Sequence, residues 1–311
     1  MKRILFTILV PLTGALFSTV GLCEGDAKAQ QQIPLAQGTS AQRPYAGEPA
    51  ERIGLLLGKA FQAGFEQPQE APVRPRRIEM SGLLGILRRV PQQYPTIQAG
   101  INASVHGDTV LVSEGTYFEN IKYRGKRIII ASRFLLDQDT SHISRTIIDG
   151  SQGVDTGSVV CFVSGEDTNS VLCGFTVRGG YGTYISSFGG IASGGGVYLF
   201  ESGGRLVRNI ITGNNVYFPN NVLGGGVSIF GLNNVGQMLI MEHNVVKGNT
   251  VTGGETIYGA GVSILRSQFR LIGNVFENDT SRASLEAGGS SVSVINTTAN
   301  NPAGIIRGNV I

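Results

Sequence analysis

Acidic residues and one arginine between positions 149 and 178 are the best candidates for polar chemistry. They are Asp149, Asp155, Glu166, Asp167 and Arg178. Glu166 and Asp167 directly follow an apolar, strand-like segment, and a loop at a strand end can hold a cation or a sugar carboxylate. Acidic side chains there also make turns and keep a surface soluble, so both interpretations stay open. The three histidines, His106, His142 and His243, show no metal-ligand spacing, and we predict no metal site.

Tyrosines supply the second kind of candidate binding residue. The chain has no tryptophan, the best sugar-stacking side chain, but tyrosine also combines a flat apolar face with a polar end. The candidates for sugar contact are Tyr181, Tyr184, Tyr198 and Tyr217. Most tyrosines of this region lie in the stretches 179–193, 213–223 and 248–258, which we expect to be loops on one side of the molecule. Any recognition is expected on these loops.

The elements that position these residues follow from an internal repeat of about 30 residues, a period typical of solenoids. Gly-Gly-Gly-Val occurs at 194–197 and 224–227 and returns as Gly-Ala-Gly-Val at 259–262. A second phrase carries an asparagine between two short apolar segments, at Asn209, Asn244, Asn274 and Asn309. At a corner, asparagine tolerates left-handed backbone angles and can bond to the next coil. We interpret these four residues as a structural ladder and not as a binding site.

The repeat units predict strands, because their apolar segments are short, rich in Val and Ile and bounded by Gly and Asn. When the repeats are aligned, apolar residues fall at equivalent positions of successive copies. One inward column is Leu172, Leu206, Met241, Leu271 and Ile306; a second is Val177, Ile211, Val246, Phe276 and Ile311; a third is Val197, Val227 and Val262. Parallel strands of successive coils lie about 4.8 Å apart, so each column becomes a continuous apolar stack. The sequence therefore predicts an all-β chain folded as a parallel β-helix.

A helix is expected to cover the first coil. Thr96 can cap its N-terminus, and Ile97, Ile101 and Val105 fall on one helical face. Residues 107 and 108, Gly-Asp, would end the helix before a strand over residues 109–112.

The N-terminal third divides into a leader and a linker. Lys2 and Arg3 precede an apolar run over residues 4–22, and Ala27-Lys-Ala29 fits a cleavage site, so residues 1–29 read as a signal peptide. The protein is then secreted, periplasmic or on the cell surface. With cleavage the mature chain has no membrane span; without it the run could serve as an anchor. Residues 30–91 read as a flexible Pro/Gln/Ala-rich linker with short helices, at 53–61 and at 83–87, and residues 92–311 as the β-helix domain.

Composition narrows the function classes. Only 15% of the residues are charged and the formal net charge is +3, which gives no support to nucleic acid as a partner. Of three cysteines one lies in the leader, so at most one disulfide, between Cys161 and Cys173, can form. No cofactor is evident from any motif.

Residues 94–103, 107–112 and 115–120 resemble the capping helix and first coil of secreted bacterial right-handed parallel β-helix proteins of the pectin-lyase-like superfamily. The resemblance covers about residues 92–311 and implies a right-handed helix with three strands per coil. Members that act on acidic glycans bind them along the outer face of the first sheet, which here would present Tyr198, Ser228, Ser263 and Ser293. A calcium-dependent lyase would need several carboxylates there, and an esterase two facing aspartates; neither pattern is found.

We therefore expect an exported protein that binds or scaffolds extracellular or envelope polysaccharide without catalysis. Two alternatives remain: a lyase or esterase relative acting on acidic glycans, with Ca²⁺ a cofactor only in the lyase case, and a surface adhesin or passenger domain. The last repeat stops midway, at Gly308-Asn-Val-Ile311. Because a solenoid needs a polar end, a C-terminal continuation or a partner is expected to cap it.

Overall fold

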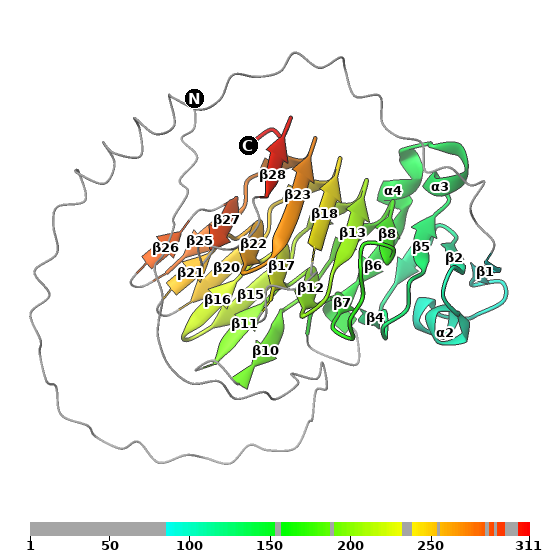
Figure 1. Ribbon diagram of the computed structural model, residues 1–311, viewed down its shortest axis with the longest axis horizontal. Coiled ribbons are helices and arrows are strands. Elements are labelled where there is room, and N and C mark those ends of the chain that lie inside the picture. Colours follow the sequence, from blue (N-terminus) through cyan, green and yellow to red (C-terminus); the bar gives the residue numbers. More distant parts are fainter. Residues whose placement is uncertain are drawn as a thin grey trace, which may run out of the picture. The chain divides into compact units, whose positions relative to one another are not determined.

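The computed structural model describes residues 85–152, 157–186, 190–231, 238–253, 256–283, 286–288, 291–295 and 304–311. These residues wind into a right-handed parallel β-helix whose strands stack into five sheets, named A to E here (Figure 1). Apart from one antiparallel pair, β10 with β11, every pairing between the described strands is parallel. The predicted fold class is confirmed. Within the described residues, none of the helices has the length and apolar character needed to cross a membrane.

Three sheets enclose the main core. In spatial order, sheet A consists of β1 (Leu87–Val90), β2 (Thr109–Val112), β5 (Ile129–Ser132), β8 (Val171–Cys173), β13 (Gly204–Val207), β18 (Met238–Glu242), β23 (Gln268–Ile272) and β28 (Ile305–Arg307). Sheet B consists of β3 (Gly115–Tyr117), β6 (Thr146–Asp149), β9 (Thr176–Arg178), β14 (Ile210–Thr212), β19 (Val245–Lys247) and β24 (Val275–Glu277). Sheet C consists of β4 (Ile121–Lys122), β7 (Val160–Phe162), β12 (Val197–Phe200), β17 (Val227–Phe230), β22 (Val262–Leu265) and β27 (Val292–Ile295).

The stretches expected to be loops form two further sheets. Sheet D consists of β10 (Thr183–Ile185), β11 (Ile191–Ser193), β16 (Asn221–Leu223), β21 (Thr256–Tyr258) and β26 (Glu286–Gly288). Sheet E consists of β15 (Asn215–Phe218), β20 (Thr250–Gly253) and β25 (Thr280–Arg282). Their physical basis is a second apolar cluster that includes Val216, Val251, Val222 and Ile257, all fully buried. The loop expectation is wrong because these short segments alternate apolar and polar residues and stack in register.

The register places equivalent residues of successive coils directly over one another. Leu206 pairs with Leu172 on one side and Met241 on the other, and Met241 pairs with Leu271. These side chains are fully buried in one continuous core. The predicted column is confirmed, and Ile306, at its end, is 43% exposed.

Helix α2 (Ile97–Ala103) covers the first coil as expected, with Thr96 Oγ1 accepting from Ala99 N at 3.0 Å. Glu119 adds a second cap, because its two carboxylate oxygens accept from the N–H groups of Ile97 and Gln98. Ile97 and Ile101 are fully buried. Val105 is not: it lies beyond the helix and is 62% exposed, because the helix ends one turn earlier than its spacing suggested.

The linker boundary at residue 91 also needs correction. Residues 87–90, predicted as part of the flexible linker with a short helix up to residue 87, form strand β1, which pairs in parallel with β2 at the edge of sheet A. Arg88 closes the core there, with its guanidinium bonded to Asp108 and to the Tyr94 hydroxyl. The β-helix therefore begins before residue 92. The leader and the rest of the linker lie outside the described residues.

The remaining elements lie at corners. Helices α3 (Phe134–Asp137) and α4 (Ser141–Arg145) connect β5 to β6, and a short 3-10 turn, η2, spans Gly150–Gln152. Cys161 and Cys173 are buried and no disulfide joins them, so the bond that the sequence allowed is not formed. Burial raises the pKa of Cys173 to about 12, which makes it an inert core residue.

Candidate functional site

The outer face of sheet E presents polar and aromatic side chains in two columns. Because Val216 and Val251 point into the core, their neighbours along each strand point outward. One column is Asn215, Thr250 and Thr280, and the other is Tyr217, Thr252 and Arg282. Tyr217 is 69% exposed, more than any other large apolar or aromatic side chain of the described residues. We refer to these six side chains as the sheet E face.

This arrangement can recognise a flat, hydroxyl-rich ligand. Successive members of a column lie about 4.8 Å apart, because parallel strands have that spacing. Tyr217 offers an apolar ring face, while the threonine hydroxyls and the Asn215 amide both donate and accept hydrogen bonds. Arg282 adds a cation two strands away from Tyr217. No member of the face other than Arg282 is charged near neutral pH.

Two more of the predicted tyrosines are exposed near sheets D and E. Tyr184, on the edge strand β10, is 58% exposed, and its ring centroid lies 5.1 Å from that of Phe218 on β15. Tyr181, just before β10, is 48% exposed. The structure therefore brings Tyr184 beside sheet E and leaves Tyr181 and Tyr217 accessible.

Tyr198 is the exception among the tyrosines. It points away from the main core, as expected, but it is only 2% exposed and packs in a smaller apolar cluster with Phe200 and Ile185. Ser228, Ser263 and Ser293, the other outward positions of sheet C, are also buried. The Tyr198 ring stacks on that of Phe200, with the ring centroids 6.2 Å apart. Tyr198 is therefore corrected from a binding residue to a packing residue.

The acidic residues predicted as one cluster are separated into different structural roles. Asp149, at the end of β6, is 5% exposed and its Oδ2 lies 2.7 Å from Arg178 Nε on β9. Burial would raise the pKa of Asp149, but hydrogen bonds from Ser151 and Arg178 outweigh it, so the pKa is lowered. Asp149 and Arg178 are a structural ion pair between neighbouring strands of sheet B.

Glu166 and Asp167 stabilise the turn between sheets C and A. Glu166 is 3% exposed, and its carboxylate accepts from Gly125 N at 2.7 Å and Ser164 N at 2.8 Å. Asp167 pairs with Arg127 at 2.8 Å. Both acids are thus committed to protein donors. Asp155 lies outside the described residues. In the part of the chain that the structure describes, no three His, Cys, Asp or Glu side chains gather as a metal site would need.

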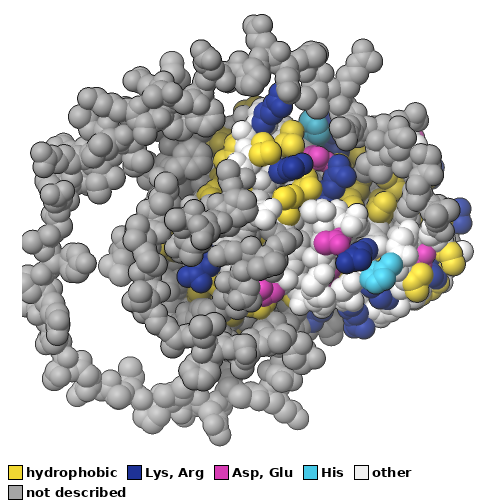
Figure 2. Space-filling view, in the orientation of Figure 1, with side chains coloured by type: hydrophobic (Ala, Val, Ile, Leu, Met, Phe, Trp, Pro, Cys, Tyr) yellow, Lys and Arg dark blue, Asp and Glu magenta, His cyan; other side chains and the backbone are white. Residues whose placement is uncertain are grey.

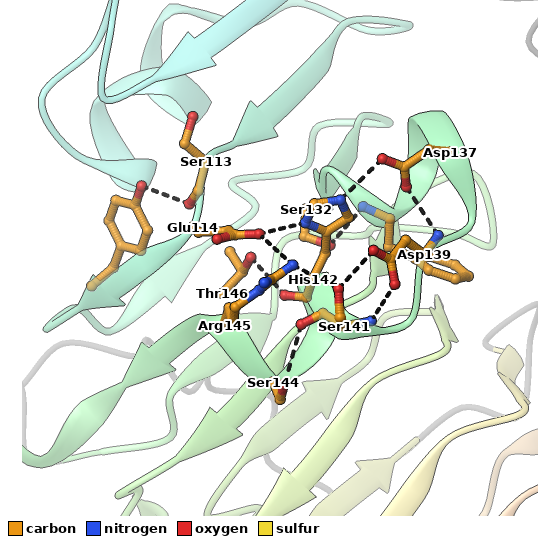
Figure 3. Close-up of polar contacts among 12 residues, drawn as sticks. Ser113, Glu114, Ser132, Asp137, Asp139, Ser141, His142, Ser144, Arg145 and Thr146 are labelled. Atoms are coloured by element: carbon orange, nitrogen blue, oxygen red, sulfur yellow. Dashed lines mark hydrogen bonds and ion pairs between the residues drawn. The ribbon is translucent and has the colours of Figure 1, made fainter.

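One histidine makes contacts that the sequence did not suggest. His142 on α4 lies between two carboxylates, with Nδ1 2.6 Å from Glu114 Oε1 and Nε2 3.0 Å from Asp137 Oδ2 (Figure 3). Burial would lower the pKa of His142, but these two hydrogen bonds outweigh it and the pKa is raised. Because both ring nitrogens are occupied, the imidazole holds the α3–α4 corner and is not available as a general base.

The four predicted asparagines form hydrogen bonds from coil to coil. Asn244 Nδ2 lies 3.0 Å from Asn274 Oδ1, and Asn209 and Asn309 extend the series at each end. The left-handed angles fall one residue earlier than expected. They belong to Arg208 (φ 55°), His243 (φ 54°), Gly273 (φ 62°) and Gly308 (φ 61°).

A second exposed surface, the outer face of sheet A, mixes apolar and basic side chains. One column runs Arg205, Ile240 and Arg270. Lys and Arg side chains also lie among hydrophobic ones on the side of the molecule seen in Figure 2. Arg205 pairs with Glu242 at 2.6 Å. With its ion pair and aliphatic side chains, this surface offers less for sugar contact than the sheet E face.

Sequence reasoning found Tyr217 but missed the other five members of the sheet E face. A signal was present: the ladder asparagines Asn209, Asn244 and Asn274 are followed five positions later by Asn214, Asn249 and Asp279, and the sheet E face begins at the next residue. The pattern was hidden because the third copy has Asp279 in place of an asparagine. The number of residues between successive copies also differs.

Comparisons with known proteins add little to these observations. No protein-family model matches the chain, and no curated protein is significantly similar to it. Among solved structures, a pectin methylesterase from Aspergillus niger is similar, with 13% sequence identity and a TM-score of 0.32, over 76% of this chain and 89% of that one. A likeness at this TM-score carries no argument about what the chain does.

Proposed function

We propose that this chain is an exported, non-catalytic polysaccharide-binding β-helix whose sheet E face contacts the glycan. Export rests on the predicted leader over residues 1–29. The observation that carries the binding proposal is Tyr217, 69% exposed on a strand, with rows of hydroxyl and amide groups beside it. A sugar ring would pack on the tyrosine while its hydroxyls bond to Thr250, Thr252 and Asn215.

The contacts of the acidic residues favour binding over catalysis. A lyase or esterase needs carboxylates that are free to hold a cation or move a proton. Asp149, Glu166 and Asp167 instead accept from Arg178, from backbone N–H groups and from Arg127. These contacts are spread over two corners of the solenoid, so the acids support structure and not a shared reaction site.

The test is glycan binding by the full chain and by the variant Tyr217→Ala. We expect retention on a glycan array, followed by titration calorimetry with the retained polysaccharide. Because a stacking aromatic is a typical hot spot, Tyr217→Ala should weaken binding about tenfold. The matched control is Phe118→Ala, since Phe118 is 47% exposed and lies outside sheets D and E. The control should bind like the unchanged chain.

Other outcomes overturn the proposal. Release of unsaturated ends or methanol from uronans, with or without Ca²⁺, would favour the lyase or esterase alternative. Binding that is equally weakened by Phe118→Ala would place the contact elsewhere. Retention of proteins but of no glycan would favour the adhesin alternative.

A further inference from the structure

A second ladder of polar side chains lies at the corner between sheets B and E, and its last member is an acid. Asn214, Asn249 and Asp279 are buried at equivalent positions of successive coils. Oδ1 of Asn249 accepts from N and Nδ2 of Asn214, at 3.2 and 2.9 Å. Oδ1 of Asp279 accepts in the same way from N and Nδ2 of Asn249, at 2.9 Å each. Asp279 Oδ1 thus accepts the same two hydrogen bonds as the side-chain oxygen of a ladder asparagine.

The other carboxyl oxygen sits where an asparagine carries its donor. A Cβ added to Gly226 would lie 3.0 Å from Asn249 Nδ2. A Cβ added to Gly261, the same glycine one coil later, would lie 2.5 Å from Asp279 Oδ2. The Asp279 side chain therefore adopts the ladder geometry, with Oδ2 in the amide position.

In that position the asparagines donate to a backbone carbonyl of the preceding coil. Asn249 Nδ2 donates to Ile211 O at 3.1 Å. Since Ile211 pairs with Val246 in the next coil, the register directs Asp279 Oδ2 toward the Val246 carbonyl. Oδ2 is buried and has no hydrogen-bond partner among the described residues. An ionised oxygen facing a carbonyl oxygen is unfavourable, whereas a protonated one donates to it.

We propose that Asp279 is a neutral carboxylic acid in the folded chain, with Oδ2–H donating to Val246 O, and that its ionisation loosens the coil containing β24 and β25. The last rung of this ladder is thereby a pH-sensitive contact built into the solenoid. The proposal is independent of any bound glycan.

The surroundings of Asp279 favour the neutral form. Burial raises the pKa of Asp279 to about 6, and the Glu277 carboxylate contributes in the same direction, against the hydrogen bonds from Asn249. Lys247 on β19 faces Glu277 at 3.9 Å, and Arg282 on β25 points outward. β20, β22 and β27 contribute no ionisable side chain. The pKa of Asp279 in the folded chain exceeds the usual value of 3.8. The contribution of Asp279 to stability is therefore fully present below pH 3.8 and is lost as pH rises through about 6.

The experiment compares the full chain with Asp279→Asn, which supplies the missing donor. Amide hydrogen exchange of residues 275–282 is followed from pH 4 to 8, corrected for the intrinsic rates. In the unchanged chain the opening constant should rise about 100-fold, because the folded pKa of about 6 lies roughly two units above the usual value of 3.8. In Asp279→Asn this rise should disappear. His142 and His243 are present in both chains, so their titration cancels in the comparison.

A second variant moves the acid one coil inward. Asn249→Asp should bring the same pH dependence to residues 245–252, and a carbon-13 titration of the Asp279 carboxyl should show protonation up to about pH 6. An Asp279 carboxyl that titrates near 3.8, or an Asp279→Asn chain that keeps the pH dependence of the unchanged one, would overturn the proposal.

Discussion

Single buried amides connect three coils in this fold. Oδ1 of Asn244 accepts from N and Nδ2 of Asn209 in the preceding coil. Its Nδ2 donates to Leu206 O and to Asn274 Oδ1. Asn244 is fully buried, so no water can replace these partners. The side chain of a single asparagine thus joins its own coil to both neighbouring coils.

Replacing Asn244 with alanine should be strongly destabilising. The substitution leaves Asn209 N–H and Leu206 C=O unpaired inside the protein, which costs about 3 kcal/mol of unfolding free energy. Denaturant titration measures the loss. Asn215→Ala, on the exposed face of sheet E, should change the free energy by less than about 0.5 kcal/mol. Equal effects of the two variants would contradict the ladder interpretation.

The two described histidines with shifted pKa values should titrate on opposite sides of 6.5. His142 is expected above that value because of Glu114 and Asp137, and His243 below it because burial and Arg208 disfavour its charge. Since the His142 pKa is raised, its stabilising contribution is present below pH 6.5 and is lost as pH rises through the raised pKa. The carboxylates are 37% and 45% exposed, so solvent screens the effect.

Nuclear magnetic resonance titration of the imidazole protons measures both values. Glu114→Gln should lower the His142 midpoint and leave the His243 midpoint unchanged, because of these two histidines only His142 contacts Glu114. Coinciding midpoints for the two histidines would contradict the geometry.

At the scale of elements, the glycine triplets that precede the strands of sheet C allow successive coils to pack closely at this corner. Gly194, Gly224 and Gly259 have φ values of 59°, 66° and 65°, and each is followed by glycines or alanine that stack on the next coil. A Cβ on Gly226 would lie 2.6 Å from Gly261 O and 2.9 Å from Val246 Cγ1. The triplet is therefore a packing requirement repeated in each coil.

Gly226→Ala should lower the unfolding free energy by about 3 kcal/mol, because backbone of the next coil must move to admit the methyl group. Gly213→Ala is the matched control. Gly213 also lies at a corner, with φ 64°, but nothing lies within 4 Å of an added Cβ, so only the backbone strain of about 1 kcal/mol is expected. Denaturation midpoints compare the variants; a smaller loss for Gly226→Ala than for Gly213→Ala would contradict the packing argument.

Some of these elements could be predicted from the sequence and others could not. Leu206, Met241 and Leu271 were predictable because their spacing repeats and each is flanked by the same motif. Sheet E was missed because its strands are short and Val216 and Val251 sit among residues typical of loops. The burial of Tyr198 could not be predicted, since it depends on packing with Ile185 and Phe230, which lie on other strands. Likewise, the partners of Glu166 and His142 come from distant segments.

On the scale of the whole molecule, each coil contacts the coils before and after it, as the sheet orders show. Stability in such a solenoid is close to a sum of unit and neighbour contributions. The N-terminal end is closed by α2 and by the Arg88–Asp108 pair. The sheet E face is therefore held by an array whose rigidity comes from stacking, and the predicted loss of binding in Tyr217→Ala should occur without loss of fold.

The parallel register of sheet E has an evolutionary consequence. Duplication of one coil would add one further row to the face, at a distance of about 4.8 Å, and would leave the existing rows in place. Deletion of a coil would shorten the face by the same increment. For the proposed binding of a linear glycan, the length of the contact surface could thus be adjusted in fixed steps by gene duplication, without redesign of any side chain.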